Sequence, residues 1–170
     1  MIKVFLVEDE VVMRNGIKNN IPWEKEGLIF AGEASDGELA YPMIKKAQPD
    51  ILITDIRMPF MDGLELSELV KKEFPKIKII ILSGYNEFDY AKQAIHIGVT
   101  DYLLKPITAS KLLEAVKKVA DVIEKEREDA RLMDKYRLEM AENTVLERQR
   151  LLRDLVTGRV NFKEALERGE

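Results

Sequence analysis

The sequence contains no cysteine. Disulfide scaffolds, thiolate metal sites and cysteine nucleophiles are therefore excluded, although this absence leaves the redox compartment open. Histidine is nearly absent as well, since His96 is the single one, at an apolar-spaced position of a helical pattern. No partner for a metal site or an acid–base relay is visible near it in the sequence, so we interpret His96 as structural.

Glycine and proline are few, with 9 and 6 among 170 residues, while apolar residues make up 46% of the chain. This composition is typical of a packed globular protein and argues against a disordered one. The length suits one ordinary domain with an additional segment better than two complete cores.

Long apolar runs and an excess of basic residues are also missing. The run Ile2–Val7, interrupted by Lys3, is too short for a signal-peptide core or a membrane span, and acidic residues follow it directly. The net charge is −4, whereas proteins that bind the nucleic-acid backbone concentrate lysine and arginine. We expect a soluble, cytoplasmic protein with no membrane contact and no DNA-binding surface of its own.

Short β-branched runs alternate with longer segments whose apolar residues are three and four positions apart. The predicted strands are Ile2–Val7, Leu28–Ala34, Ile51–Thr54, Ile77–Leu82 and Tyr102–Leu104. The predicted helices are Val11–Asn20, Glu38–Ala47, Leu64–Phe74, Glu87–Ile97 and a fifth that begins near Ser110. Because each parallel connection needs a crossover, this alternation predicts an α/β fold with a doubly wound (βα)5 parallel sheet. Pro42 falls inside the second helix and should kink it or shift its start.

The last third of the chain has a different composition. From Lys111 to about Thr157 it lacks proline and glycine and is densely charged, which predicts one long helix or two in series. Apolar residues recur at Leu112, Val116, Val119 and Ile123, then at Leu138, Val145 and Leu152. The phase between the two series is not kept and charged residues interrupt the stripe, so a coiled coil that dimerises in parallel stays a hypothesis.

The end of this segment carries helix signals of its own. Gly158 is expected to stop the long helix, and Asn161 to cap a short helix from Phe162 to Arg168. We therefore expect a domain at residues 1–125 and a helical linker at residues 126–170, which ends as if truncated before a further domain.

Reactive side chains follow the predicted strands. In open parallel sheets the ligand site lies beyond the carboxyl ends of the strands. This rule brings Glu8, Asp9 and Asp55 within a few ångströms of one another, where like charges raise the pKa of each carboxyl and destabilise the fold. Mg2+ compensates such a cluster, because it prefers oxygen ligands and uses one or two carboxylates together with phosphate oxygens. With Lys105 as a second cation and Ser83 as a hydroxyl donor, the pocket suits phosphoryl transfer to Asp55.

Four motifs in this order carry a family resemblance. They are Leu6-Val7-Glu8-Asp9-Glu10, Thr54-Asp55-Ile56-Arg57-Met58-Pro59-Phe60-Met61-Asp62-Gly63, Ile81-Leu82-Ser83-Gly84-Tyr85 and Asp101-Tyr102-Leu103-Leu104-Lys105-Pro106. Through them, residues 1 to about 125 resemble the CheY-like receiver domains of two-component response regulators. The resemblance implies a flavodoxin-like strand order of 2-1-3-4-5.

The resemblance also implies roles for single residues. Asp55 would be the phosphoacceptor, while Asp9 and the main-chain carbonyl of Arg57 would bind Mg2+ directly and Glu8 directly or through water. The phosphoryl oxygens would be held by Ser83, Gly84 and Lys105.

Conformational roles follow from the same likeness. The Lys105–Pro106 peptide bond would be cis, and Tyr102 would be a switch aromatic that turns inward as Ser83 moves toward the phosphate. Arg57 and Tyr85 would flank the path of the hydrolytic water, which implies slow self-dephosphorylation.

Partners are implied in the same way. A sensor histidine kinase would supply the phosphoryl group, and a homodimer would form through the linker and the face made by the fourth helix, fifth strand and fifth helix. Ile21-Pro22-Trp23 and the run from Ser83 to Ala91 resemble regulators with an AraC-type helix-turn-helix output domain. That domain is absent from this chain, so DNA binding is implied only for a longer parent protein.

Structural interpretations stand beside the functional ones. Trp23 is expected in the core or as a cap on the sheet edge, Tyr102 could simply be packed, and the charge run Glu124–Arg131 is expected to be a solvated helix face.

Two other functions compete with a phosphorylation switch. A haloacid-dehalogenase-like phosphatase also uses an aspartate nucleophile at a strand end, but such enzymes resemble one another in a second acid two residues later, where this chain has Arg57. Turnover of external substrates is therefore not expected, only Mg2+-dependent self-phosphorylation and autodephosphorylation. A scaffold that dimerises through the long helix without phosphorylation is the other alternative.

Overall fold

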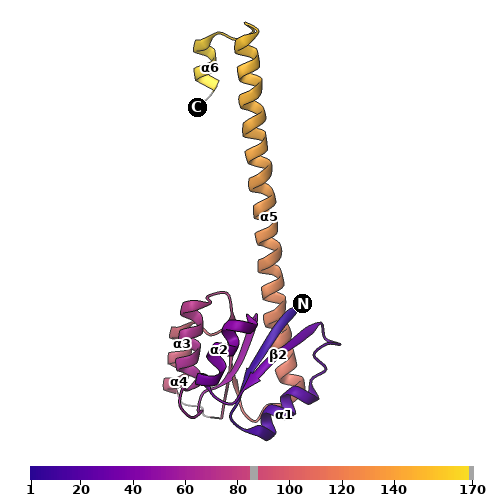
Figure 1. The fold of residues 1–170 in the computed structure, drawn as a ribbon, viewed down its shortest axis with the longest axis vertical. Helices are drawn as coiled ribbons and strands as arrows, with labels where there is room; N and C mark the ends of the chain where they lie inside the picture. The colour runs from indigo at the N-terminus through magenta and orange to yellow at the C-terminus, as the bar shows by residue number, and fades with distance from the viewer. Residues whose placement is uncertain (85–87, 169–170) are drawn as a thin grey trace. The chain divides into compact units, whose positions relative to one another are not determined.

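The computed structural model describes residues 1–84 and 88–168, and its elements are labelled in Figure 1. The chain forms two compact units, Met1–Ile123 and Glu124–Glu170. The first unit contains the sheet, and the described part of the second contains only helices and their connection.

The first unit is built on a parallel sheet of five strands in the order β2-β1-β3-β4-β5. The strands are β1 (Ile2–Val7), β2 (Leu28–Ala34), β3 (Ile51–Asp55), β4 (Lys78–Ser83) and β5 (Asp101–Leu104). All residues of β3 are buried, as expected for a central strand with helices on both faces. The predicted (βα)5 fold and its strand order are confirmed.

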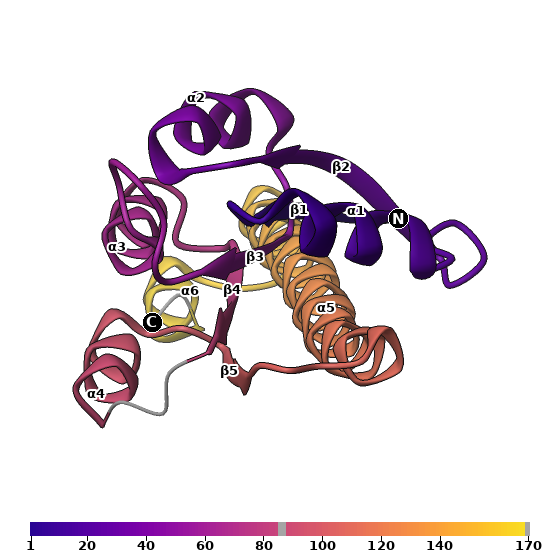
Figure 2. The same cartoon turned by 90° about the horizontal axis from the view of Figure 1, so that it is seen from below.

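Helices cover both faces of this sheet, as Figure 2 shows. One face carries α1 (Val11–Asn20) and the part of α5 (Ala109–Val156) that belongs to the first unit; the other carries α2 (Gly37–Ala47), α3 (Gly63–Glu73) and α4 (Phe88–Ile97). Each face has its own cluster of buried apolar side chains. The apolar residues that α5 buries recur at helical spacing: Leu112, Ala115, Val116, Val119, Ala120 and Ile123.

Aspartate caps determine where α2 and α3 begin. Asp36 Oδ1 accepts a hydrogen bond from Leu39 N at 2.9 Å, and Asp62 Oδ1 accepts one from Glu65 N at 2.8 Å. Each helix therefore begins at a glycine, one residue before the position that apolar spacing predicts. The predicted first residue of the fourth helix, Glu87, lies outside the described residues.

Pro42 does not shift the start of its helix. It occupies an interior position of α2, which begins at Gly37. Pro42 is exposed, so water can reach the main-chain carbonyl that the proline ring leaves without an N–H partner. Of the two expected effects, the shift of the helix start does not occur, and the kink stays a prediction.

In the second unit, α5 continues to Val156 without a break, so the chain forms one long helix rather than two in series. Every residue from 124 to 150 is exposed, which confirms the solvated charge run. Gly158 has φ +70° beyond the helix end, and Asn161 Oδ1 accepts from Glu164 N at 2.9 Å at the start of α6 (Phe162–Arg168). Both end signals behave as predicted. Within the described ranges, no helix is at once long and apolar enough for a bilayer span.

Candidate functional site

Three carboxylates gather at the carboxyl edge of the sheet. Glu8 and Asp9 follow β1, and Asp55 is the last residue of the neighbouring strand β3. One oxygen from each carboxylate lies within 4.8 Å of the other two. Glu8 is fully buried and Asp55 is 8% exposed. The sequence correctly predicted that these groups would lie together.

Lys105 supplies a positive charge to this cluster. Its Nζ lies 2.8 Å from Glu8 Oε2 and 3.0 Å from Asp55 Oδ2. Its main-chain N–H donates to the Ser83 carbonyl at 2.8 Å, which ties the loop after β5 to the end of β4. The Lys105–Pro106 peptide bond is cis. One ammonium group thus contacts two of the three carboxylates.

The charges of the cluster are unequally compensated. Burial raises the pKa of the Glu8 carboxyl, the hydrogen bond from Lys105 opposes that effect, and repulsion by Asp55 adds to it, so the pKa stays above its usual value. Burial by itself would lower the pKa of Lys105, but its hydrogen bonds to Glu8 and Asp55 outweigh burial, and the pKa is raised. Lys105 therefore remains charged. Ionising Glu8 costs free energy, because its carboxylate is buried beside Asp55.

Main-chain contacts fix Asp55 in place. Its Oδ1 accepts from the N–H of Ile56 at 2.7 Å, and its carbonyl accepts from Thr54 Oγ1 at 2.9 Å. Gly63 closes the loop behind it, because its N–H donates to the Ile56 carbonyl at 2.8 Å and a Cβ at this position would lie 1.7 Å from the Asp55 carbonyl oxygen. Only glycine permits this approach.

Two supporting residues had not been identified from the sequence. Gly63 belongs to a quoted motif, so its place beside Asp62 was an available signal, but its contact depends on the path of the loop. Arg14 of α1 donates from Nη1 to the Glu8 carbonyl at 2.6 Å, and no motif marked it.

The remaining predicted residues lie at the same edge or near it. Ser83 is buried at the end of β4, and Gly84 follows it at a position where a Cβ would meet no atom of the described residues within 4 Å. Tyr102 of β5 is half-buried and packs against the apolar cluster on the α2–α4 face. Its packing is therefore confirmed, and its role as a switch stays a prediction.

Arg57 points its side chain toward α4. Its Nε donates to Tyr90 Oη at 3.2 Å, and its guanidinium lies 5.7 Å from the centre of the Tyr90 ring. The role of its main-chain carbonyl as a Mg2+ ligand stays a prediction. Tyr85, the other residue expected to flank the path of the hydrolytic water, lies outside the described residues.

The donor set fits a magnesium ion. Glu8, Asp9 and Asp55 offer oxygen atoms only, which is the preference of a hard cation. Burial and the charge of Asp55 leave the pKa of Glu8 raised despite the hydrogen bond from Lys105, so a divalent cation beside Glu8 and Asp55 would compensate negative charge that the protein itself leaves unbalanced.

Trp23 and His96 have structural positions. Trp23 is buried, stacks at a tilt on Phe30 with ring centres 5.5 Å apart, and donates from Nε1 to the Lys18 carbonyl at 3.2 Å. The predicted core role of Trp23 is confirmed. His96 is exposed on α4.

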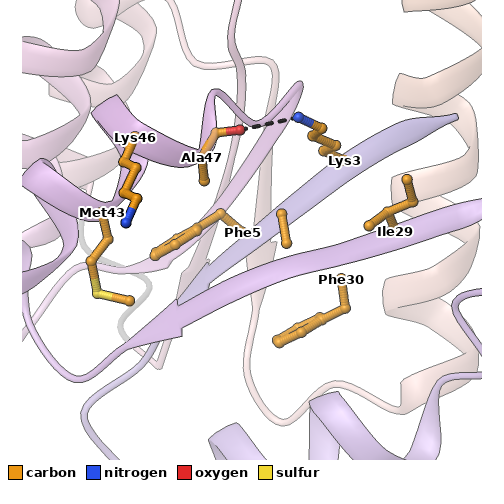
Figure 3. Close-up of a pocket in the computed structure, with 8 residues that line it drawn as sticks. Lys3, Phe5, Ile29, Phe30, Met43, Lys46 and Ala47 are labelled. Carbon is orange, nitrogen blue, oxygen red and sulfur yellow. Dashed lines mark hydrogen bonds between the residues drawn. The ribbon is translucent and has the colours of Figure 1, made fainter.

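A cavity of about 700 Å3 lies away from these carboxylates, between α2 and the first halves of β1 and β2 (Figure 3). Its lining is Lys3, Phe5, Ile29, Phe30, Ala31, Met43, Lys46 and Ala47. None of these residues is an acid, a histidine or a hydroxyl residue, and the Lys3 ammonium already donates to the Ala47 carbonyl at 3.3 Å. The cavity therefore offers no carboxylate, imidazole or hydroxyl group that could accept a phosphoryl group or bind a metal ion, unlike the carboxylate edge.

Comparison with known families gives one match that covers most of the chain. Residues 4–117 match the family model of the response regulator receiver domain. The transcriptional regulatory protein YesN of Bacillus subtilis is 40% identical over 129 residues, which are 76% of this chain and 34% of that protein.

Solved structures agree with this match. The REC domain of AraT, a response regulator from Geobacillus stearothermophilus, is 39% identical with a TM-score of 0.69, over 74% of this chain and 97% of that one. A two-component transcriptional regulator AraC from Clostridium phytofermentans is 31% identical with a TM-score of 0.65, over 75% and 98% of the two chains. The chain spans between 34% and 50% of the length of the curated relatives it matches.

Proposed function

This chain belongs to the response regulator receiver family, and from that premise we propose that Asp55 accepts the phosphoryl group of a two-component phosphorelay. A receiver domain is a signalling module whose partner is a histidine kinase, not a classical enzyme. One observation carries the proposal: carboxylate oxygens of Glu8, Asp9 and Asp55 lie within 4.8 Å of one another, with Lys105 Nζ 3.0 Å from Asp55 Oδ2.

Glu8, Asp9, Asp55 and the main-chain carbonyl of Arg57 would hold Mg2+. When bound, the ion would neutralise charge on the oxygens of the phosphoryl group. The N–P bond of a kinase phosphohistidine breaks as a carboxylate oxygen of Asp55 bonds to phosphorus, and the electron pair of the broken bond stays on the imidazole. Lys105 adds a second positive charge at the same point, while Ser83 and Gly84 hold phosphoryl oxygens by hydrogen bonds.

The phosphoryl group acts as a switch by shifting a conformational population. Phosphorylated Asp55 draws Ser83 and Lys105 inward, and Tyr102 fills the space behind Ser83. Moving such an equilibrium from 1:99 to 99:1 takes about 5.5 kcal/mol of differential interaction. Four new or strengthened charge-assisted hydrogen bonds, at about 1.5 kcal/mol each, would together supply an interaction free energy of this size.

The switch would transmit its signal through the helical linker to a DNA-binding domain. We assign residues 1–125 to the receiver and residues 126–170 to a helical linker that pairs with a second copy, aided by the face of α4, β5 and α5. A DNA-binding domain of the AraC type would follow in a longer, cytoplasmic parent. This assignment is supported by the greater length of the relatives, among which YesN is a transcriptional regulatory protein.

This chain lacks the general acid that the rival phosphatase function requires. The residue two positions after Asp55 is Arg57, whose side chain is engaged with Tyr90. No carboxylate stands at that position to activate water for turnover.

The proposal is tested by intact mass after incubation of the protein with Mg2+ and phosphoramidate. Wild type should gain one base-labile phosphoryl group, and Asp55→Asn should gain none. Asp121→Asn, which changes an exposed carboxylate of α5, should behave like wild type, and chelation of Mg2+ should abolish the gain. Catalytic release of phosphate would support the phosphatase instead, and folded protein with no gain would support a scaffold.

A further inference from the structure

Arg14 contacts the peptide group that joins two of the proposed magnesium ligands. Its Nη1 donates to the Glu8 carbonyl at 2.6 Å, and its side chain is only 16% exposed. That carbonyl belongs to the peptide between Glu8 and Asp9, so its orientation governs the directions in which both side chains leave the main chain. We propose that Arg14, braced by Glu33, is a positioning residue that holds Glu8 and Asp9 in the geometry that Mg2+ requires.

Glu33 of β2 braces the guanidinium from the neighbouring strand. Its Oε2 lies 4.0 Å from Arg14 Nε, and its Oε1 lies 3.1 Å from Lys18 Nζ. Oε2 is buried and accepts no hydrogen bond from any residue that the structure describes. Arg14 is the cation placed next to it, so a small movement of the guanidinium would complete this pair.

The same strand also holds the ligand segment, through the N–H group of Glu8. The Glu8 N–H donates to the Ala34 carbonyl at 3.1 Å, one residue after Glu33. Glu8 Oε1 accepts from Glu10 N at 3.1 Å. The main chain of Glu8 is therefore held at both its N–H and its carbonyl, and Arg14 provides the second of these contacts.

A magnesium site is sensitive to such support. Mg2+ demands near-ideal octahedral geometry, and removing groups that orient its ligands weakens metal binding about 10-fold to 100-fold. The inference rests on the proposed function, because it needs Mg2+ to bind at Glu8, Asp9 and Asp55.

Charge and positioning predict opposite effects of removing Arg14. A guanidinium near the site repels a cation, so loss of its charge alone would strengthen Mg2+ binding. Loss of the contact with the Glu8 carbonyl would weaken it. If removing Arg14 weakens Mg2+ binding, Arg14 is a positioning residue. If removing it strengthens Mg2+ binding, Arg14 acts only as a nearby charge.

The experiment is calorimetric titration of the phosphate-free protein with Mg2+, which measures binding without any transfer activity. Arg14→Gln should bind Mg2+ about 10-fold more weakly than wild type, and Arg14→Lys should recover part of the loss. Glu33→Gln, which leaves Arg14 in place without its brace, should weaken binding by a smaller factor. The matched controls are Lys45→Gln and Glu73→Gln, which make the same charge changes in a surface ion pair of 3.2 Å, and both should bind as wild type does.

Each outcome decides the inference. Unchanged or tighter binding by folded Arg14→Gln overturns it. If Arg14→Gln does not fold, Arg14→Lys decides, because it keeps the positive charge and changes only the contact with the Glu8 carbonyl, and wild-type affinity in that variant overturns the inference. If wild type itself binds no Mg2+, the proposed metal site fails and the inference with it, a result that differs from failure of the Arg14 variants alone.

Discussion

A carboxylate without exposed surface, such as Glu8, is tolerated in its ionised form only when neighbouring groups replace the water it has lost. Lys105 and the Glu10 N–H replace part of that water, while Asp55 adds repulsion. Because the result is a raised pKa for Glu8, ionising this residue stabilises the unfolded protein more than the folded one in the absence of Mg2+.

This pKa shift predicts a pH dependence of stability in metal-free protein. The folded pKa of Glu8 lies above the unfolded one, so its protonated form favours folding. The free energy of unfolding should therefore fall as pH rises from the ordinary value of 4.5 through the raised folded value, and then level off. Urea unfolding in a chelator from about pH 4 to pH 7 measures it, with Glu8→Gln as the variant that lacks this titration. The stability of wild type relative to Glu8→Gln should fall across that window, and parallel curves would contradict the raised pKa.

Magnesium should oppose this pH dependence, because it stabilises the folded protein more at high pH than at low pH. Stabilisation by a bound ion grows as RT ln(1 + [Mg2+]/Kd), about 2.7 kcal/mol at a hundredfold excess over Kd. Because protonation of Glu8 competes with the ion, this stabilisation should shrink as pH falls through the same window.

At the scale of single residues, the sequence predicted which side chains form the site better than it predicted the contacts that support them. Glu8, Asp9, Asp55 and Lys105 follow strands of one parallel sheet, so the rule for strand ends was enough to bring them together. The link between Arg14 and the Glu8 carbonyl depends on how α1 lies across β1 and β2, which periodicity does not specify.

At the scale of elements, local signals predicted the helices and strands within a few residues. The differences arise at caps and loops: Asp36 and Asp62 begin their helices one residue earlier than apolar spacing indicates. Pro42 is tolerated because it faces solvent, a fact about burial that a propensity rule omits.

The β3–α3 connection should be intolerant of a side chain at Gly63. A Cβ there would lie 1.7 Å from the Asp55 carbonyl oxygen, so Gly63→Ala must displace the main chain that carries Asp55. We expect a loss of roughly 3 kcal/mol of stability and a fall in phosphorylation at saturating Mg2+. Urea unfolding and intact mass measure the two effects. Gly16→Ala is the matched control, because Gly16 lies in α1 with its nearest neighbouring atom 3.9 Å from the added Cβ, and it should be neutral or stabilising by about 0.5 kcal/mol. A Gly63→Ala variant as stable as wild type would show that the loop yields without cost.

At the scale of the whole molecule, the sequence predicted one long helix or two in series, because helix propensity and charge pattern are local properties, and the structure shows one, α5. It did not establish whether α5 pairs with another chain, since pairing depends on the free energy of association. The structure adds the exposure of the apolar series: Leu138, Val145 and Leu152 are all exposed on α5. Ala141 and Leu155 extend this series at three-residue offsets, while Arg148 interrupts it.

We expect this stripe to mediate association of two copies and phosphorylation to strengthen it. Burying Val145 in a parallel dimer contributes about 1.5 kcal/mol per chain, so Val145→Glu should raise the dissociation constant at least roughly 100-fold. Sedimentation equilibrium measures this constant, with and without Mg2+ and phosphoramidate. Tyr136→Glu is the control, because Tyr136 is similarly exposed but two residues before Leu138 and hence on the opposite side of the helix. Equal effects of the two variants would mean non-specific association, and an unchanged dissociation constant on phosphorylation would show that the signal does not travel through linker pairing.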